Sequence, residues 1–521
     1  MSKRPSFVFI MTDQHRADWL SCAGHNVVKT PNLDALARNG IRFENFYTAS
    51  PVCMPNRASF MTGRYPSVHG LRYNGCALPA SANTFVDILS ANGYKTAAIG
   101  KSHLQPFSDN PPDWGEVAET GPIEDAWKLD GTDYTQEEPI HYEANGRFQI
   151  KLPYYGFQYI DMVTGHGDRC GGHYQQWFRQ NVTNWQELQD RKNQLPHEYT
   201  CPQAYRTPVP EELYSTAYIR DRSLQYLKNA AACDEPFFLF ISFPDPHHPF
   251  NPPGKYWDMY KPEDFDLALP YDAHKNPTPP MQWLYENWKA GGGQKSPQTA
   301  MMIDDRQLQE AMALTAGMIA CIDDAVGDLI GALKNLDLAD NTVVAFNADH
   351  GDYLGDFNML LKGSLPFRSI TQVPFIWSDP KGPSGTTSDQ LVSTVDLPLS
   401  ILERAGVKPF FGTQGKSFLP HLNAGSAPTH EAVLIEYNDS MPRLGFANAP
   451  RVRALASKEW RYTVYADQEW GELYNLQTDM RETNNLWNDP NYAATRAQFS
   501  EQMTNHLIHQ MDESPRSTRR A

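Results

Sequence analysis

The feature that most constrains this fold is a series of short, nearly continuous apolar runs. They are FVFIM (7–11), FFLFISF (237–243), TVVAFNA (342–348) and VPFIW (373–377). None alternates between apolar and polar residues, as a strand with one face in water would. Strands buried on both faces are typical of a parallel sheet that is covered by helices on each side. We therefore expect these runs to form the centre of such a sheet.

Segments with helical periodicity lie between these runs. Residues 30–40 begin with Thr30 as a cap and Pro31 in the first turn, and they end at Gly40. A short strand is expected at 95–100. The other helical segments span 82–93, 211–231 and 310–335. This alternation predicts an α/β domain whose mostly parallel sheet is sandwiched by helices.

The C-terminal part has a different pattern. A linker near 425 is followed by four β-type runs, AVLIEYN, RVRALAS, WRYTVYA and ELYNLQ, and by a helix near 490–510. These predict a small antiparallel sheet with a terminal helix. We expect a main domain at 1–425, with surface insertions near 106–205 and 250–300 that shape a pocket. An α+β subdomain and a mobile tail would occupy 426–521.

Composition excludes several classes of protein. The chain has 521 residues, 40% hydrophobic and 20% charged, which is typical of a soluble globular protein. Its net charge of −16 argues against a nucleic-acid partner, and its apolar runs are too short to span a membrane. Residues 1–14 contain two basic residues and then a short apolar run, which we interpret as a core strand rather than a signal peptide. We therefore expect a cytoplasmic protein. Seven irregularly spaced cysteines argue against a disulfide framework or structural zinc.

Acidic and basic side chains follow four of the predicted strands. Taken singly, each has a plain structural interpretation, such as an aspartate that caps a turn or a solvated lysine. Their joint occurrence matters because ligands bind beyond the carboxyl ends of strands in such sheets. The residues are Asp13, Gln14, Lys101, His103, Asp245, His247, His248, Asp349, His350 and Asp352.

These strand ends suit a particular chemistry. Asp13, Gln14, Asp349 and His350 offer the oxygen and nitrogen ligands that hard divalent cations prefer. The group Lys101, His103, His247 and Lys362 would add positive charge and protons around that cation. The combination predicts hydrolysis of a small anionic ester.

The stretch CMPNR (53–57) raises a separate question. Taken alone, Cys53 is a buried core thiol, a nucleophile, a metal ligand or the precursor of another group. With the downstream Thr62-Gly63-Arg64, the stretch resembles the C-x-P-S-R signature of type I sulfatases in the alkaline phosphatase superfamily. Further segments resemble that family in the same order: TDQHRAD, TPNLDALARNG, GYKTAAIGKSHL, NADHGDYLGD with LLKGS, and ELYNLQTDMRETNNL.

The resemblance implies an alkaline-phosphatase-like fold, a sulfatase activity and a modified cysteine. In this family the cysteine is oxidised by a maturation enzyme to formylglycine, whose aldehyde hydrate attacks sulfur. A helix starting near Arg57 would place residue 53 at an anion-favouring helix N-terminus. The implied metal ligands are Asp13, Gln14, Cys53, Asp349 and His350, around calcium or, as an alternative, manganese.

The family also implies roles for the surrounding residues. Arg57 would hold the hydrate, and Lys101 and Lys362 would bind sulfate oxygens. His103 would accept the proton that drives sulfate release, and His247 would protonate the leaving oxygen. Asn74 is a weaker candidate for a substrate contact, and the family favours a homo-oligomer.

Three positions depart from the family pattern. Gln14 stands where many sulfatases have a second aspartate, and phosphonate monoester hydrolases and some bacterial sulfatases resemble this chain there. Asn56 replaces the usual serine, and Ser102 stands where an aromatic residue is common. The alternatives to a sulfate monoester hydrolase are a phosphonate monoester or phosphodiester hydrolase and a non-catalytic binding protein. Lys101 and His103 favour sulfate, and the filled catalytic positions argue against a binding protein. The sequence does not specify the leaving group.

Overall fold

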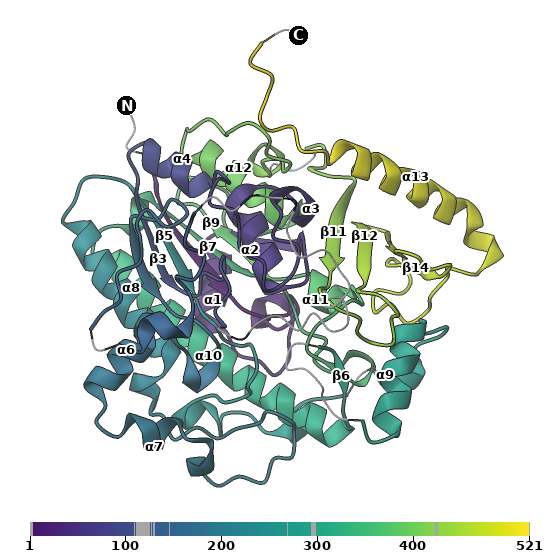
Figure 1. Ribbon diagram of the computed structural model, residues 1–521, viewed down its shortest axis with the longest axis horizontal. Coiled ribbons are helices and arrows are strands. Elements are labelled where there is room, and N and C mark those ends of the chain that lie inside the picture. Colours follow the sequence, from purple (N-terminus) through teal and green to yellow (C-terminus); the bar gives the residue numbers. More distant parts are fainter. Residues whose placement is uncertain are drawn as a thin grey trace.

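The computed structural model describes residues 4–108, 110, 126, 128, 131–144, 146–267, 269–292, 299–422 and 426–519. Among these residues, eight strands form one large sheet in the order β10–β2–β9–β7–β1–β5–β3–β4. Figure 1 labels β3, β5, β7 and β9 of this sheet. Only β9 runs antiparallel to its neighbours β2 and β7, and the other described pairs are parallel. The predicted mostly parallel sheet is confirmed.

The strands of the large sheet are β1 (Ser6–Thr12), β2 (Ile41–Tyr47), β3 (Lys95–Gly100), β4 (Tyr159–Met162), β5 (Phe237–Ser242), β7 (Thr342–Ala348), β9 (Phe375–Ser378) and β10 (Thr386–Ser393). The helices are α1 (Pro31–Arg38), α2 (Cys53–Thr62), α3 (Pro66–His69), α4 (Phe85–Ala91), α6 (Gly172–Asn181), α7 (Trp185–Gln189), α8 (Ser215–Ala231), α9 (Pro279–Lys289), α10 (Asp305–Asn335), α11 (Arg368–Thr371), α12 (Leu397–Arg404) and α13 (Ala493–His509).

The two faces of the sheet bury alternate side chains of the same strand. In β1, Phe7 and Phe9 pack into a cluster with residues of α2, α4 and α12. Val8 and Ile10 point the other way, into a cluster with residues of α1, α6, α8 and α10. Because both faces are covered, a strand in this position carries apolar residues without alternation. That is why its sequence reads as a continuous apolar run.

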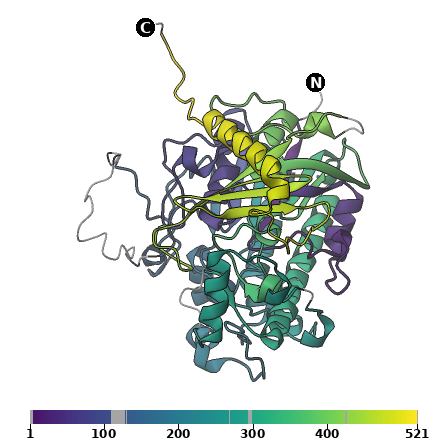
Figure 2. The same ribbon diagram turned by 90° about the vertical axis from the view of Figure 1, so that its right-hand side faces the viewer.

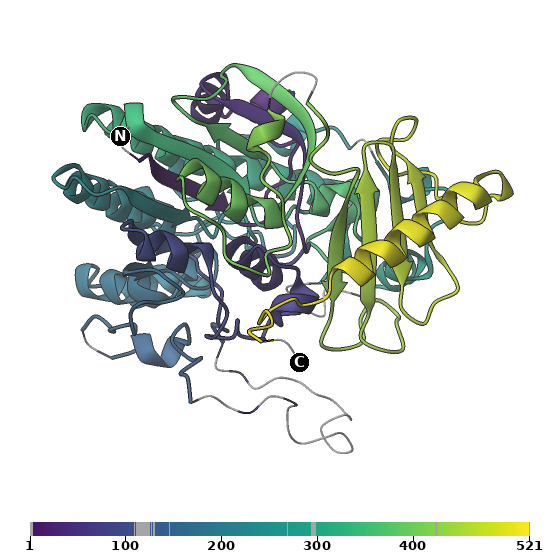
Figure 3. The same cartoon turned by 90° about the horizontal axis from the view of Figure 1, so that it is seen from above.

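A smaller sheet follows in the C-terminal part. It is an antiparallel meander of β11 (Ala432–Asn438), β12 (Arg451–Ser457), β13 (Trp460–Tyr465) and β14 (Gly471–Asn475). Helix α13 lies across one face of it, as Figures 2 and 3 show, and contributes Phe499 and Met503 to the shared core. On the opposite face, Val433 and Ile435 pack against Tyr47 of the large sheet. The predicted small sheet with a terminal helix is confirmed.

Some boundaries differ from expectation. Helix α2 begins at Cys53, not near Arg57. The expected insertion near 106–205 includes β4, which pairs with β3, so part of that range belongs to the main sheet rather than to the surface. The expected insertion near 250–300 contains α9, whose Met281 and Leu284 pack in a core cluster with residues of the C-terminal sheet. The predicted boundary at 425 lies outside the described residues.

A two-stranded ribbon of β6 (Met301–Met302) and β8 (Met359–Leu360) precedes Lys362. Within the described part of the chain, no helix is long and apolar enough to cross a bilayer.

Gly100 ends β3 in close contact with the backbone of β5. Its φ is +111°, and a Cβ built there would lie 1.9 Å from the carbonyl oxygen of Ser242. Only glycine fits a backbone contact this close. The next residue is Lys101, so the contact also fixes where that lysine leaves the sheet.

We predict that G100A lowers the free energy of unfolding by about 3 kcal/mol or more, because both the dihedral angle and the contact oppose a methyl group. Gly93 provides the matched control: its φ is +87°, but no atom lies within 4 Å of a built Cβ. G93A should therefore cost about 1 kcal/mol, from the dihedral angle alone. Urea denaturation of both variants measures the difference, and equal losses would contradict the packing argument.

Candidate active site

Five neighbouring strands of the large sheet end at one functional edge. The order β7–β1–β5–β3–β4 brings together side chains from segments up to 336 positions apart in sequence, from Asp13 to Asp349. All the polar residues that were predicted after β1, β3, β5 and β7 are buried at this edge. This follows from parallel pairing, because the carboxyl ends of parallel strands share an edge.

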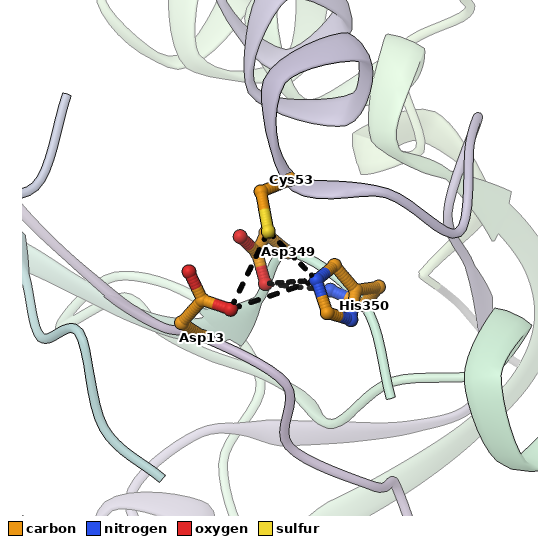
Figure 4. A group of neighbouring side chains, drawn as sticks. All are labelled: Asp13, Cys53, Asp349 and His350. Atoms are coloured by element: carbon orange, nitrogen blue, oxygen red, sulfur yellow. Dashed lines mark hydrogen bonds and ion pairs between the residues drawn. The ribbon is translucent and has the colours of Figure 1, made fainter. Parts of the chain in front are cut away.

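The centre of this edge is a cluster of four possible ligand groups. Atoms of Asp13, Cys53, Asp349 and His350 all lie within 4.8 Å of one another (Figure 4). The Nδ1 of His350 lies 2.8 Å from the carbonyl oxygen of Gly351, which leaves Nε2 facing the cluster. That Nε2 is 3.0 Å from the Sγ of Cys53 and 3.5 Å from Oδ1 of Asp13. A backbone partner of this kind is how proteins orient ligating histidines.

Cys53 occupies the first position of α2, after Val52 as N-cap. Its side chain is buried, and burial together with the charge of Asp13 raises the pKa of the thiol to about 11. A thiol with this pKa is almost wholly protonated near neutral pH and is a weak nucleophile. The Nζ of Lys362 approaches its Sγ to 3.5 Å.

Arg57 lies one helical turn after Cys53, so both side chains extend from the same face of α2. Its guanidinium donates to Oδ2 of Asp349 at 2.8 Å and to Oδ2 of Asp13 at 3.4 Å. It also donates to the carbonyl oxygen of Lys101 at 2.9 Å and to the hydroxyl of Ser242 at 2.8 Å. One buried cation thereby connects the ends of β1, β3, β5 and β7.

Lys101 is buried and its Nζ lies 2.5 Å from Oδ2 of Asp13, so it is not a solvated charge. Burial alone would raise the pKa of Asp13, but the coulombic effect of Lys101 and other cations outweighs it. The pKa of Asp13 is held well below its usual range. Asp13 is therefore ionised at any physiological pH.

Gln14 has a left-handed backbone, with φ of +62°. Its amide oxygen accepts from Nζ of Lys362 at 2.8 Å, and its amide nitrogen donates to Oδ2 of Asp352 at 2.5 Å. Asp352 also accepts the backbone N–H groups of Leu354 and Leu361, as a turn-capping residue does. These contacts turn the oxygen of Gln14, rather than its nitrogen, toward Lys362.

His247 and its neighbours form an imidazole stack. The ring of His247 lies 3.6 Å from that of His166 and 3.9 Å from that of His248. Its Nδ1 is 2.6 Å from the carbonyl oxygen of His248, and its Nε2 is 2.9 Å from Nζ of Lys362. Burial and the neighbouring His166 lower the pKa of His247 well below its usual value. A neutral ring with Nδ1–H that accepts from Lys362 fits both contacts.

His103 lies on the loop after β3, stacked on Phe107 with ring centroids 4.0 Å apart. Burial, followed by the charges of Lys101 and Arg57, lowers its pKa well below the usual value. Among the described residues, its buried Nδ1 has no hydrogen-bond partner. The imidazole is therefore neutral and has a nitrogen free to accept a proton.

Two more predicted positions lie beside the cluster. Asn74 accepts the backbone N–H of Met54 at 3.2 Å, next to Cys53. Asn56 donates to the carbonyl oxygen of Asp349 at 2.5 Å and accepts the N–H of Ala49 at 3.0 Å. The asparagine found in place of serine thus fastens the start of α2 to the end of β7.

His166 is a site residue that was not predicted from the sequence. Its Nε2 is 2.7 Å from Nζ of Lys101 and 3.9 Å from Oδ2 of Asp13. It follows β4, a four-residue strand inside the range that we expected to be a surface insertion. Recognising YIDM as a strand would have placed His166 at a strand end, like the other site residues.

Comparisons with known proteins identify the family of this chain. The sulfatase family model matches residues 5–407, and a model described as the C-terminal part of N-sulphoglucosamine sulphohydrolase matches residues 362–509. The chain belongs to the sulfatase family. Its enzyme class is accordingly that of a sulfuric ester hydrolase, in the alkaline phosphatase superfamily.

Individual relatives match over nearly the whole chain. The arylsulfatase of Clostridium perfringens is 27% identical, over 94% of this chain and 91% of its own. The choline-sulfatase of Rhizobium meliloti is 26% identical, over 94% and 83%. The crystal structure of a phosphonate monoester hydrolase from Agrobacterium radiobacter has a TM-score of 0.77 at 23% identity, over 98% and 97%, which shows a common fold.

Proposed function

We propose that this sulfatase hydrolyses sulfate monoesters with a formylglycine derived from Cys53. The observation that carries the proposal is the position of Cys53. Its buried Sγ lies at the start of α2, within reach of Lys362, His350 and Asp13. As an unmodified thiol it is protonated and poorly nucleophilic in these surroundings, whereas an aldehyde hydrate there would be directed at an anion held by the lysines.

The donor set fits one divalent metal ion. Asp13, Asp349 and His350 would hold it together with the modified residue 53, and these four positions cluster in the structure. The amide oxygen of Gln14, which accepts from Lys362 at 2.8 Å, would complete the set on turning from that lysine to the ion. Carboxylate and amide oxygens favour a hard cation, calcium first and manganese as the alternative. When bound, such an ion would act as a Lewis acid and lower the pKa of the attacking hydroxyl.

The chain's own residues would then divide the work. Lys101 and Lys362 would bind the sulfate oxygens, and Arg57 would hold the carboxylates of Asp13 and Asp349 in place. The hydroxyl of residue 53 would lose its proton to solvent and attack sulfur, and the bond from sulfur to the ester oxygen would break. His247, whose Nε2 lies 2.9 Å from Nζ of Lys362, would take a proton from that ammonium group and pass it to the departing oxygen.

His103 would complete the cycle. Its neutral imidazole accepts the proton of the second hydroxyl on residue 53, the carbonyl forms, and sulfate leaves with the electron pair of its bond to carbon. Addition of water restores the hydrate. Asn74 would orient the start of α2 and contact substrate, and His166 would help to hold Lys101.

Other expectations stay predictions. They are a small anionic ester as substrate, a maturation enzyme that oxidises Cys53, a homo-oligomeric state, a cytoplasmic location and the domain division near residue 425. A phosphonate monoester or phosphodiester hydrolase is the alternative function. Gln14 favours it, because its neutral amide leaves the site with one negative charge fewer than a second aspartate would.

The modification can be tested directly. Mass spectrometry of the peptide that contains residue 53 should show an aldehyde or its hydrate, and C53A should lose at least about 1,000-fold in kcat because no nucleophile remains. C22A, at a half-buried cysteine outside the site, is the control and should keep its activity. An active enzyme with an unmodified thiol would refute the mechanism.

The metal site can be tested by binding alone. After treatment with a chelator, titration calorimetry with Ca²⁺ and Mn²⁺ should show one site, and D13N should weaken it by at least about 100-fold. D245N is the matched control. Asp245 is a buried carboxyl after β5, outside the donor set, and burial raises its pKa to about 7. Equal affinities of the two variants would show that Asp13 is not a ligand.

The reaction class needs paired substrates with the same phenol. We expect a higher kcat/KM for the aryl sulfate than for the aryl phosphonate monoester, because Lys101 and His103 suit sulfate transfer. K101A and H103A should reduce sulfate turnover by about 100-fold or more. Faster turnover of the phosphonate by the unaltered enzyme would favour the alternative function.

A further inference from the structure

A buried carboxylate outside the catalytic cluster holds the loop that carries His103. Glu137 accepts three successive backbone N–H groups: that of His103 at 2.9 Å, Leu104 at 3.0 Å and Gln105 at 3.2 Å. The hydroxyl of Tyr154 also donates to it, at 2.6 Å. Glu137 is fully buried, and burial raises the pKa of its carboxyl. The four donors offset part of the cost of burying its charge.

The loop requires such support because its backbone is unfavourable. His103 has a φ of +58°, a left-handed conformation that a residue with a β-carbon adopts only when its surroundings enforce it. The adjacent Gln136 adds a second attachment, since its N–H donates to the side-chain oxygen of Gln105 at 3.0 Å. The loop is thereby locked to segment 136–137 in one conformation.

The type of acceptor matters here. Two carboxylate oxygens can accept three converging N–H groups, whereas an amide offers one oxygen and places an NH₂ group against the remaining donors. The contacts reach the main chain of residue 103 itself, so a small shift of the loop moves the imidazole. Misplacement of a proton acceptor by about 1 Å is enough to lower a rate by about 100-fold.

We propose that Glu137 is a positioning residue that fixes His103 for the release of sulfate from residue 53. The inference rests on the proposed function of His103. In that step the hydroxyl proton passes to His103, its electron pair forms the carbonyl, and the bond between carbon and the sulfate oxygen breaks. Loosening the loop should slow this step and leave the attack on sulfur largely intact.

The test compares E137Q with H103A and with E138Q, which changes the neighbouring, partly exposed glutamate. With excess aryl sulfate, E137Q should lose about 10- to 100-fold in kcat with KM changed by less than about twofold. Intact-mass spectrometry should then find enzyme carrying one covalent sulfate group in E137Q and H103A, and not in E138Q. Turnover of E137Q at the wild-type rate would overturn the proposal. Slow turnover of E137Q without sulfated enzyme, in a comparison where H103A accumulates it, would also overturn the proposal.

Hydrogen–deuterium exchange separates this proposal from the role of His103. The amides of residues 103–105 should exchange faster in E137Q than in E138Q or wild type. Unchanged exchange would refute the positioning role. If exchange is faster in E137Q but H103A does not accumulate sulfated enzyme, the result would instead show that His103 does not serve sulfate release.

Y154F covers the case in which E137Q does not fold. It keeps the carboxylate and removes one donor to it, and we expect faster exchange at 103–105 and a smaller fall in kcat. Wild-type exchange and turnover in Y154F would then overturn the proposal.

Discussion

The structure depends on one buried arrangement of charge: two carboxylates, Asp13 and Asp349, with the guanidinium of Arg57 between them. Each carboxylate ends a central strand, and burying either without a partner would be very costly. Arg57 pairs with both and reaches the ends of β3 and β5 as well. Together with Lys101, which pairs with Asp13, it balances the two negative charges. Docking of helix α2 at this edge therefore supplies one of the two cations, and it places Cys53 beside both carboxylates.

The fold makes that arrangement possible through parallel pairing. Because β7, β1, β5, β3 and β4 are adjacent and parallel, their carboxyl ends deliver ligands, lysines and histidines to one edge. Two uncharged contacts also hold the elements at this edge close together. Gly100 lies against the backbone of Ser242, and the side chain of Asn56 donates to the carbonyl oxygen of Asp349. The rigid sheet supplies the cluster, and the loops after it supply the groups that would move protons.

Much of the site followed from the sequence because its residues lie directly after strands or within a short motif. Asp13, Lys101, His247 and Asp349 each follow an apolar run, and Cys53 belongs to a recognisable signature. His166 and Glu137 gave no such signal. The strand before His166 is only four residues long, and Glu137 lies in a segment without periodicity. Its partners are backbone amides about 32–34 positions away in the chain, so no residue pattern marks the contact.

The sequence by itself determined the α/β class, the family and the identities of the strand-end residues, because apolar runs and local motifs are properties of short segments. Only the tertiary structure decided which strand ends are neighbours, that Lys101 pairs with Asp13, that Lys362 pairs with His247, and that Glu137 fixes the His103 loop. These contacts join segments distant in sequence, and the order of strands in the sheet, rather than any local pattern, sets the distances between them.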